Sequence, residues 1–214
     1  MSLICFDCET TGLLAVSAAD IKHQPHLIDL YAIKLTDDLV RFNTFHVRCK
    51  PPIPIPLDAT KVHGITDHDV VECHSFASIY PTIAEFFLGS RVLVGHNLLY
   101  DKMVLYYELM RIGKNLNFPW AVKGICTAEV SSQYHGYRMN LTDLHISLFG
   151  EGFAGAHSAS SDCEITLKCF VEMKRREMVT ALWVNGQRPT LRCRWLWSCA
   201  PIACPTRNCA ARLT

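Results

Sequence analysis

The chain has 214 residues, enough for one domain of ordinary size with a terminal extension. Half of the residues are hydrophobic and the formal net charge is only +1, which excludes a protein drawn to nucleic acid by bulk positive charge alone. No charged leader precedes an apolar stretch, and no run of about 18 apolar residues occurs. We therefore expect a cytoplasmic protein with no membrane association.

The charge is unevenly distributed along the chain. From Gly186 onward there are five arginines and no acidic residue, which leaves 16 basic against 20 acidic residues elsewhere. We expect a mildly acidic domain over residues 1–180 and a basic tail with cysteines and tryptophans over residues 181–214. The tail cysteines lack paired C-x-x-C knuckles, so their spacing gives little support to a zinc site. Eleven cysteines without a secretory signal indicate reduced thiols rather than a disulfide framework.

The hydrophobic pattern predicts a mixed α/β domain. Strands are expected over residues 3–8, 27–36, 39–47 and 91–94, and helices over residues 58–63, 75–88, 100–111, 141–149 and 158–178. Asp37 and Asp38 predict a hairpin turn, and four prolines within residues 51–56 predict an extended connector because they remove backbone donors. Three antiparallel strands followed by alternating helices and strands indicate a mixed central sheet with helices on both faces.

The first strand ends in two acidic residues. Side chains two apart in a strand point to the same face, so we expect Asp7 and Glu9 to point the same way. Two carboxylates in this arrangement form an oxygen-rich site suited to Mg²⁺ or Mn²⁺. On its own, the pair is more typical of a solvated strand terminus. Cys5 and Cys8, three apart, should point to opposite faces, which disfavours a redox pair.

Four further candidate site residues each have an ordinary structural explanation. Asp101 is expected in the first turn of a helix, where its interaction with the helix dipole is worth about 0.3–1 kcal/mol. Asn97 is a candidate cap for that helix. His157 follows a glycine-rich approach, and Asp162 lies in the first turns of the last helix. The caps are expected to be Asp58 for the helix at 58–63 and a Ser161–Glu164 capping box for the last helix.

Considered together and in their order along the chain, these motifs point to one protein family. The patterns D-x-E-T-T-G-L from residue 7, H-N-x-x-x-D from residue 96 and H-x-A-x-x-D from residue 157 resemble those of the DEDDh exonucleases, the DnaQ-like family. Residues 59–66 are similar to a further stretch of that family, and the resemblance covers about residues 3–176. It implies a ribonuclease H-like fold and hydrolysis of nucleic-acid ends from 3′ to 5′, one nucleotide at a time.

The resemblance also implies residue roles. Asp7, Glu9 and Asp162 would hold one Mg²⁺ or Mn²⁺ ion, Asp7 would bridge to a second near Asp101, and His157 would be the general base. These catalytic residues are Asp7, Glu9, Asp101, His157 and Asp162, and the four acids are the metal ligands. Thr11, Gly12 and Leu13 would line the terminal nucleotide, with secondary contacts from His63 and Asn97. Residues 13–26 form a longer segment than the family leads us to expect and flank this site.

Alternatives remain open at this stage. The expected partner is a nucleic-acid 3′ end, single-stranded DNA first, and a proofreading role would add a DNA polymerase. The same metal site serves relatives that trim RNA, because only a contact to the 2′-hydroxyl separates the two substrates. A non-catalytic polymerase-binding module is the third reading. It is disfavoured because a retired site has no reason to keep all five groups.

Overall fold

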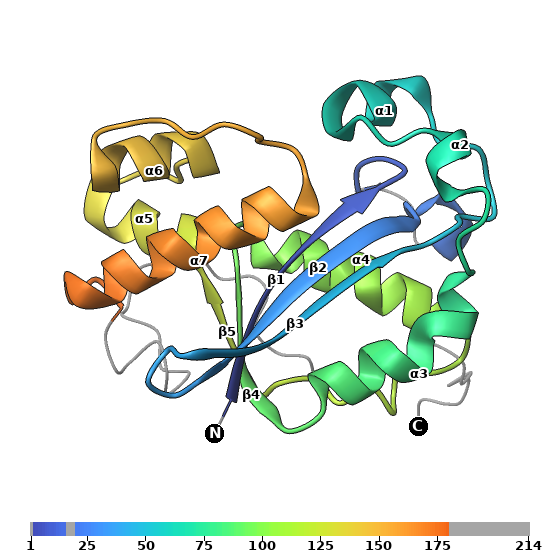
Figure 1. The fold of residues 1–214 in the computed structure, drawn as a ribbon, viewed down its shortest axis with the longest axis horizontal. Helices are drawn as coiled ribbons and strands as arrows, with labels where there is room; N and C mark the ends of the chain where they lie inside the picture. The colour runs from blue at the N-terminus through green and yellow to red at the C-terminus, as the bar shows by residue number, and fades with distance from the viewer. Residues whose placement is uncertain (1, 16–19, 180–214) are drawn as a thin grey trace, which may run out of the picture.

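In the computed structural model, residues 2–15 and 20–179 are described, and within them the strands form a single five-stranded sheet in the order β3-β2-β1-β4-β5 (Figure 1). The strands are β1 (Ser2–Thr10), β2 (Leu27–Thr36), β3 (Arg41–Arg48), β4 (Ser90–Gly95) and β5 (Lys123–Cys126). Strand β2 pairs antiparallel with both β1 and β3, whereas β4 pairs parallel with β1 and β5 pairs parallel with β4. The predicted mixed sheet is confirmed.

Helices cover both faces of the sheet (Figure 1). They are α1 (Leu57–His63), α2 (Asp67–Val70), α3 (Phe76–Phe87), α4 (Leu98–Arg111), α5 (Thr127–His135), α6 (Leu141–Phe149) and α7 (Ala159–Arg175), with a 3₁₀ turn over Ile21–His23. Helices α3 and α4 pack into one core and α6 and α7 into the other, whereas α5 contributes Ala128 to the first core and Val130 to the second. Among the described helices, none combines the length and apolar character that crossing a bilayer requires.

Strand β1 lies between the two cores. Ile4 and Phe6 are fully buried in the core that contains α3 and α4, whereas Leu3 and Cys5 are buried in the core that contains α7. The Phe6 ring packs edge-on against the Phe87 ring, with 5.5 Å between the ring centroids. Full burial of side chains of this size stabilises the fold by about 1.5–3 kcal/mol each. The strand is therefore held from both sides, and the side chains at its end are placed accurately.

Besides the 3₁₀ turn, three elements were not predicted from the sequence: the four-residue helix α2, strand β5 and helix α5. Strand β5 has four residues and is followed directly by α5, so the segment is too short to show either the strand period or the helix period.

The predicted connector and hairpin turn are confirmed. Residues 51–56 lie outside any strand and precede α1, and Asp37 and Asp38 form the turn between β2 and β3. The expected tail over residues 181–214 lies outside the described residues.

Both predicted helix caps are wrong. Helix α1 begins after Pro56, and Asp58 lies in its first turn, paired with Lys61 at 2.7 Å. Helix α7 is capped by Ser158, whose Oγ accepts from the Ser161 amide at 3.2 Å. The predicted partner in the capping box, Glu164, instead accepts hydrogen bonds from the side chains of Arg41 and Tyr31. Ser158 directly precedes this helix, whereas Ser160 and Ser161 lie in its first turn.

Candidate active site

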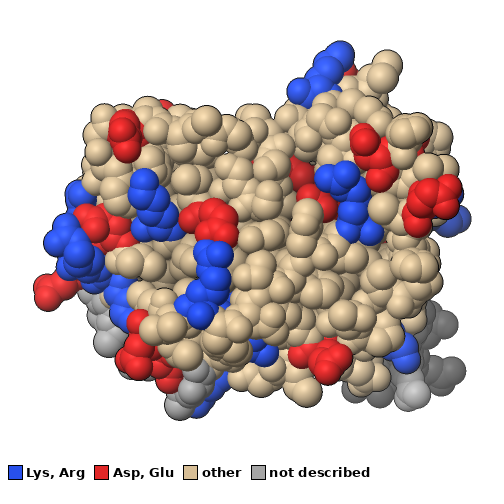
Figure 2. All heavy atoms as spheres, viewed as in Figure 1, with Lys and Arg blue, Asp and Glu red and all other residues tan. Residues whose placement is uncertain are grey.

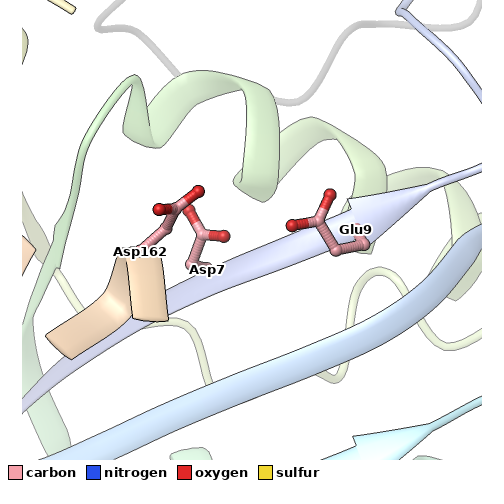
Figure 3. A group of neighbouring side chains, drawn as sticks. All are labelled: Asp7, Glu9 and Asp162. Carbon is pink, nitrogen blue, oxygen red and sulfur yellow. The ribbon is translucent and has the colours of Figure 1, made fainter. Parts of the chain in front are cut away.

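Three carboxylates from two distant segments meet at the end of β1. Asp7 and Glu9 project from one face of the strand, and Asp162 projects from the first turn of α7 (Figure 3). Each offers one oxygen, and these oxygens all lie within 4.8 Å of one another. The predicted common orientation of Asp7 and Glu9 is confirmed, and α7 brings the third acid to them.

A pair of buried cysteines sets the position of Asp162. The Cys163 thiol donates to the Cys5 carbonyl at 3.3 Å, and the Cys5 thiol lies 3.6 Å from the Cys163 carbonyl. Because Cys163 follows Asp162 and Cys5 lies two residues before Asp7 on the same strand face, this contact fixes the two acids beside each other. Cys5 and Cys8 belong to opposite cores, which agrees with the expectation that they do not form a redox pair.

Asp101 lies beside this group rather than within it. It is buried in the first turn of α4, with 3% of its surface exposed. Hydrogen bonds from the backbone of Asp101 itself and of Cys8 lower its pKa, but burial raises it more strongly. Among the neighbouring charges, that of Asp101 has the largest influence on the pKa of Asp7. The structure therefore brings the four predicted acids together from β1, α4 and α7.

The acids oppose one another's ionisation. Burial raises the pKa of Asp7 well above its ordinary value, and the charges of Asp101, Glu9 and Asp162 raise it further. Burial also raises the pKa of Glu9 to about 7, with additions from Asp162 and from Asp29, its pairing partner on β2. The pKa of Asp162 is raised by burial too, although the His157 amide partly offsets this. Without cations, the ionised site is under electrostatic strain.

This strain predicts an unusual pH dependence of the metal-free protein. An acid whose pKa is raised on folding binds more protons in the folded state, so its contribution to the free energy of unfolding is present at low pH and is lost as pH rises. For Glu9 the loss runs from about pH 4.5 to about pH 7. We expect the free energy of unfolding of Glu9→Gln, measured with urea in EDTA, to increase relative to that of the parent as the pH rises through this window. A difference between the two proteins that does not change between pH 4.5 and 7.5 would contradict this prediction.

The donor set suits a hard divalent cation. Asp162 Oδ2 accepts from the His157 amide at 3.0 Å, but Oδ1 is buried without a hydrogen-bond partner among the described residues. A buried carboxylate oxygen with no partner is costly, and a cation held jointly with Asp7 and Glu9 would satisfy it. Carboxylate oxygens are the ligands that Mg²⁺ and Mn²⁺ prefer.

His157 is close to the acids through its backbone. It has a φ of 68° and an exposed side chain at the end of the loop that precedes α7. Positive φ is uncommon for residues other than glycine, although histidine is among those that tolerate it. Its amide donates to Asp162, whereas the residue is exposed to solvent.

The predicted substrate segment is anchored to α4 by a residue the sequence analysis did not single out. The hydroxyls of Tyr100 and Thr10 each lie 2.7 Å from the Gly12 carbonyl and 2.6 Å from each other. Thr11 is buried, and Leu13 is 85% exposed. Tyr100 precedes Asp101 in the motif, and this adjacency was the only available signal. The helix that carries Asp101 thus also holds the turn after β1.

The other two predicted contacts are His63 and Asn97. His63 accepts from the Ile65 amide through Nδ1 at 3.0 Å, and its Nε2 is buried without a partner among the described residues. Burial lowers the pKa of His63. Asn97 occupies the N-cap position of α4 with φ 64°, but its side chain makes no capping bond. Its Oδ1 accepts from Arg138 at 2.9 Å instead.

The long segment before β2 is tied firmly to the C-terminal part of α4. The Arg111 side chain donates to Glu108 at 2.8 Å and to three backbone carbonyls of the segment, those of Ile21, Gln24 and Pro25. His26 then pairs with Thr11, whose amide donates to the His26 carbonyl at 2.9 Å and whose hydroxyl accepts from the His26 amide at 2.8 Å. The described part of this segment therefore supports the turn after β1.

Comparisons with known proteins agree with this geometry. The RNase_T exonuclease family model matches residues 4–170. The chain is 27% identical over 173 residues to a DNA polymerase III subunit epsilon of Pasteurella multocida, covering 79% of this chain and 67% of the relative. The chain thus spans about two thirds of the length of that relative.

Two solved structures share the fold. Exonuclease X, in complex with 5′ overhanging duplex DNA, superposes with a TM-score of 0.61 at 21% identity, over 85% of this chain and 96% of that one. The nuclease domain of 3′hExo, a DEDDh family member bound to rAMP, has a TM-score of 0.66 at 17% identity, over 82% of this chain and 92% of that one. The expected ribonuclease H-like architecture is confirmed. By its family match, its fold and the order of its acidic motifs, the chain belongs to the exonuclease family, as a 3′–5′ exonuclease of the DEDDh type.

Proposed function

We propose that this exonuclease removes nucleotides one at a time from the 3′ end of DNA, in a reaction that depends on two Mg²⁺ or Mn²⁺ ions. The observation that carries the proposal is the convergence of four acids whose pKa values are raised. One buried oxygen of Asp162 also has no hydrogen-bond partner within the described part of the chain. Membership of the family implies divalent metal ions. The number of ions and the identity of each ligand belong to the proposal.

Each acid has a proposed ligand role. Asp7, Glu9 and Asp162 would hold one ion, and Asp7 with Asp101 would hold the second. When bound, the ions would polarise the phosphodiester and neutralise the charge that develops on its oxygens. The protein's own part is to keep the acids in place, and the double burial of β1 and the Cys5–Cys163 contact serve that purpose.

His157 is the proposed general base, which accepts a proton from the attacking water. Two observations support this role: the residue is exposed, and its backbone amide donates to Asp162, so that it lies next to one of the acids. Thr11, Gly12 and Leu13 would line the terminal nucleotide. The exposed Leu13 side chain offers an apolar contact for a base of any sequence. His63 and Asn97 would make secondary contacts.

The charge distribution favours binding of nucleic acid through the acidic site itself rather than through a broad basic surface. Figure 2 shows lysines and arginines interspersed with acidic residues on one face, without a continuous basic stretch. Long-range attraction to nucleic acid would then be weak, and binding would depend on contacts at the 3′ end.

We further propose that residues 1–180 form the exonuclease domain, with residues 181–214 as a basic tail. The family match over residues 4–170 supports this boundary.

DNA is the first substrate because curated relatives are named as subunits of a DNA polymerase. By the same likeness, we propose a proofreading or DNA-processing role in the cytoplasm with a polymerase as partner. RNA is the second candidate, since the 3′hExo domain, with the same fold, is bound to rAMP. A non-catalytic module is disfavoured, because it would have no need of buried acids that destabilise the fold.

A substrate panel tests the proposal. We expect 5′-labelled single-stranded DNA, and duplex DNA with a mismatched 3′ end, to shorten in single-nucleotide steps with Mg²⁺ or Mn²⁺ and to persist in EDTA. Single-stranded RNA of the same sequence should be cut more slowly. Faster cutting of the RNA would transfer the proposal to RNA trimming. Internal cuts, or shortening that continues in EDTA, would contradict the metal-dependent exonuclease reaction.

A further inference from the structure

His145 is a buried histidine that none of the motifs includes. It lies in α6 with 1% of its surface exposed, and both of its ring nitrogens have partners. Nδ1 lies 2.7 Å from the Glu151 carbonyl, and Nε2 lies 2.9 Å from Lys168 Nζ. The ring therefore joins three segments, which are α6, the loop that follows it and α7.

The partners determine which nitrogen carries the proton. A carbonyl oxygen can only accept a hydrogen bond, so Nδ1 must donate to Glu151. An ammonium group can only donate, so Nε2 must accept from Lys168. The ring also packs against Phe149 and Phe153, with centroids 4.6 and 5.5 Å away. Its orientation is thus fixed by two hydrogen bonds and two aromatic contacts, and Glu151 and Phe153 both belong to the loop.

That loop leads directly to His157. It begins at Gly150, where α6 ends in a left-handed cap, and it ends where the His157 amide donates to Asp162 at 3.0 Å. Between Phe153 and His157 the residues are exposed. The loop is therefore held by His145 near its start and by Asp162 at its end.

We propose that His145 is a positioning residue for His157. Its Nδ1–H bond to the Glu151 carbonyl sets the path of the loop, so that the His157 ring can reach the attacking water. The inference rests on the proposed role of His157 as general base. Misplacement of a reacting group by about 1 Å can cost up to about 10²-fold in rate. Loss of the attachment should therefore act on kcat more than on KM.

Two substitutions separate the hydrogen bond from the packing. His145→Leu keeps an apolar side chain but removes the donor, and His145→Asn keeps an amide donor near the position of Nδ1. We expect His145→Leu to lower kcat by roughly 10- to 100-fold with KM changed less than about threefold, and His145→Asn to recover most of the rate. Tyr134→Phe is the matched control. It removes a hydroxyl bond to the Glu177 carbonyl (3.2 Å), a similar attachment remote from the loop, and should leave kcat unchanged.

A double-mutant cycle with His157→Asn decides between positioning and general stability, because asparagine tolerates the positive φ of this position. The full-length variants are compared with labelled single-stranded DNA below their melting temperatures. If His145 acts through His157, His145→Leu causes no further loss once His157 is asparagine. The same fold loss in both backgrounds, or no rescue by His145→Asn, overturns the positioning role alone. If His157→Asn keeps the parental rate, the general-base role fails, and the inference falls with it.

Discussion

Replacing Asp7 with asparagine is expected to abolish exonuclease activity and to stabilise the metal-free protein. Asp7 is the proposed ligand shared by both ions, so its loss should remove transition-state stabilisation worth several kcal/mol, a rate loss of at least about 10³-fold. Its carboxylate is also the one whose pKa is raised by burial and by all three other acids. An uncharged isostere removes that repulsion.

The two effects are measured separately. Initial rates on labelled single-stranded DNA with saturating Mg²⁺ report activity, and urea unfolding in EDTA at pH 8 reports stability. Because burial and the three neighbouring acids raise the pKa of Asp7, we expect the free energy of unfolding of Asp7→Asn at this pH to exceed that of the parent. Added Mg²⁺ should stabilise the parent more than Asp7→Asn, because a ligand stabilises only the fold that binds it.

Glu172→Gln is a suitable control for Asp7→Asn. Glu172 lies on α7, as Asp162 does, but it pairs with Arg175 and Arg176 at the exposed end of the helix. Its replacement should leave the rate and the response to Mg²⁺ unchanged. An Asp7→Asn protein that keeps its activity, or that is stabilised by Mg²⁺ as strongly as the parent, would contradict the proposed metal site.

Replacing His157 should cost about 10²–10⁴-fold in kcat, the usual share of a general base. Because the ring is exposed, the free energy of unfolding should change little. Alanine is disfavoured at a φ of 68°, so His157→Asn is the matched variant, since asparagine tolerates this conformation. Both variants keep the backbone amide that holds Asp162, so stabilisation by Mg²⁺ should remain.

The pattern across these variants is diagnostic. Asp7→Asn should lose both activity and the response to Mg²⁺, whereas the His157 variants should lose activity alone. Single-turnover rates with excess enzyme measure the chemical step directly. A His157→Asn protein with the parental single-turnover rate would show that another group accepts the proton.

Part of this site could be predicted from the sequence, because it depends on residues that are near neighbours in the chain. The two-residue period of a strand places Asp7 and Glu9 on one face whatever surrounds them. The three acidic motifs, in their order along the chain, indicate the family and with it the mixed sheet. Glycine and proline punctuation also marks most helix ends and the connector at residues 51–56. These features depend on a few neighbouring residues, and for that reason they can be predicted without the fold.

Contacts between distant residues were decided only by the tertiary structure. Asp162 meets Asp7 because Cys163 and Cys5, 158 positions apart, dock α7 on β1. The competition between Ser158 and Ser161 for the cap of α7 is settled by the same docking. Tyr100 and His145 were not predicted for this reason, because their roles depend on the carbonyls of Gly12 and Glu151. Sequence periodicity carries no information about which backbone groups a folded chain leaves within a side chain's reach.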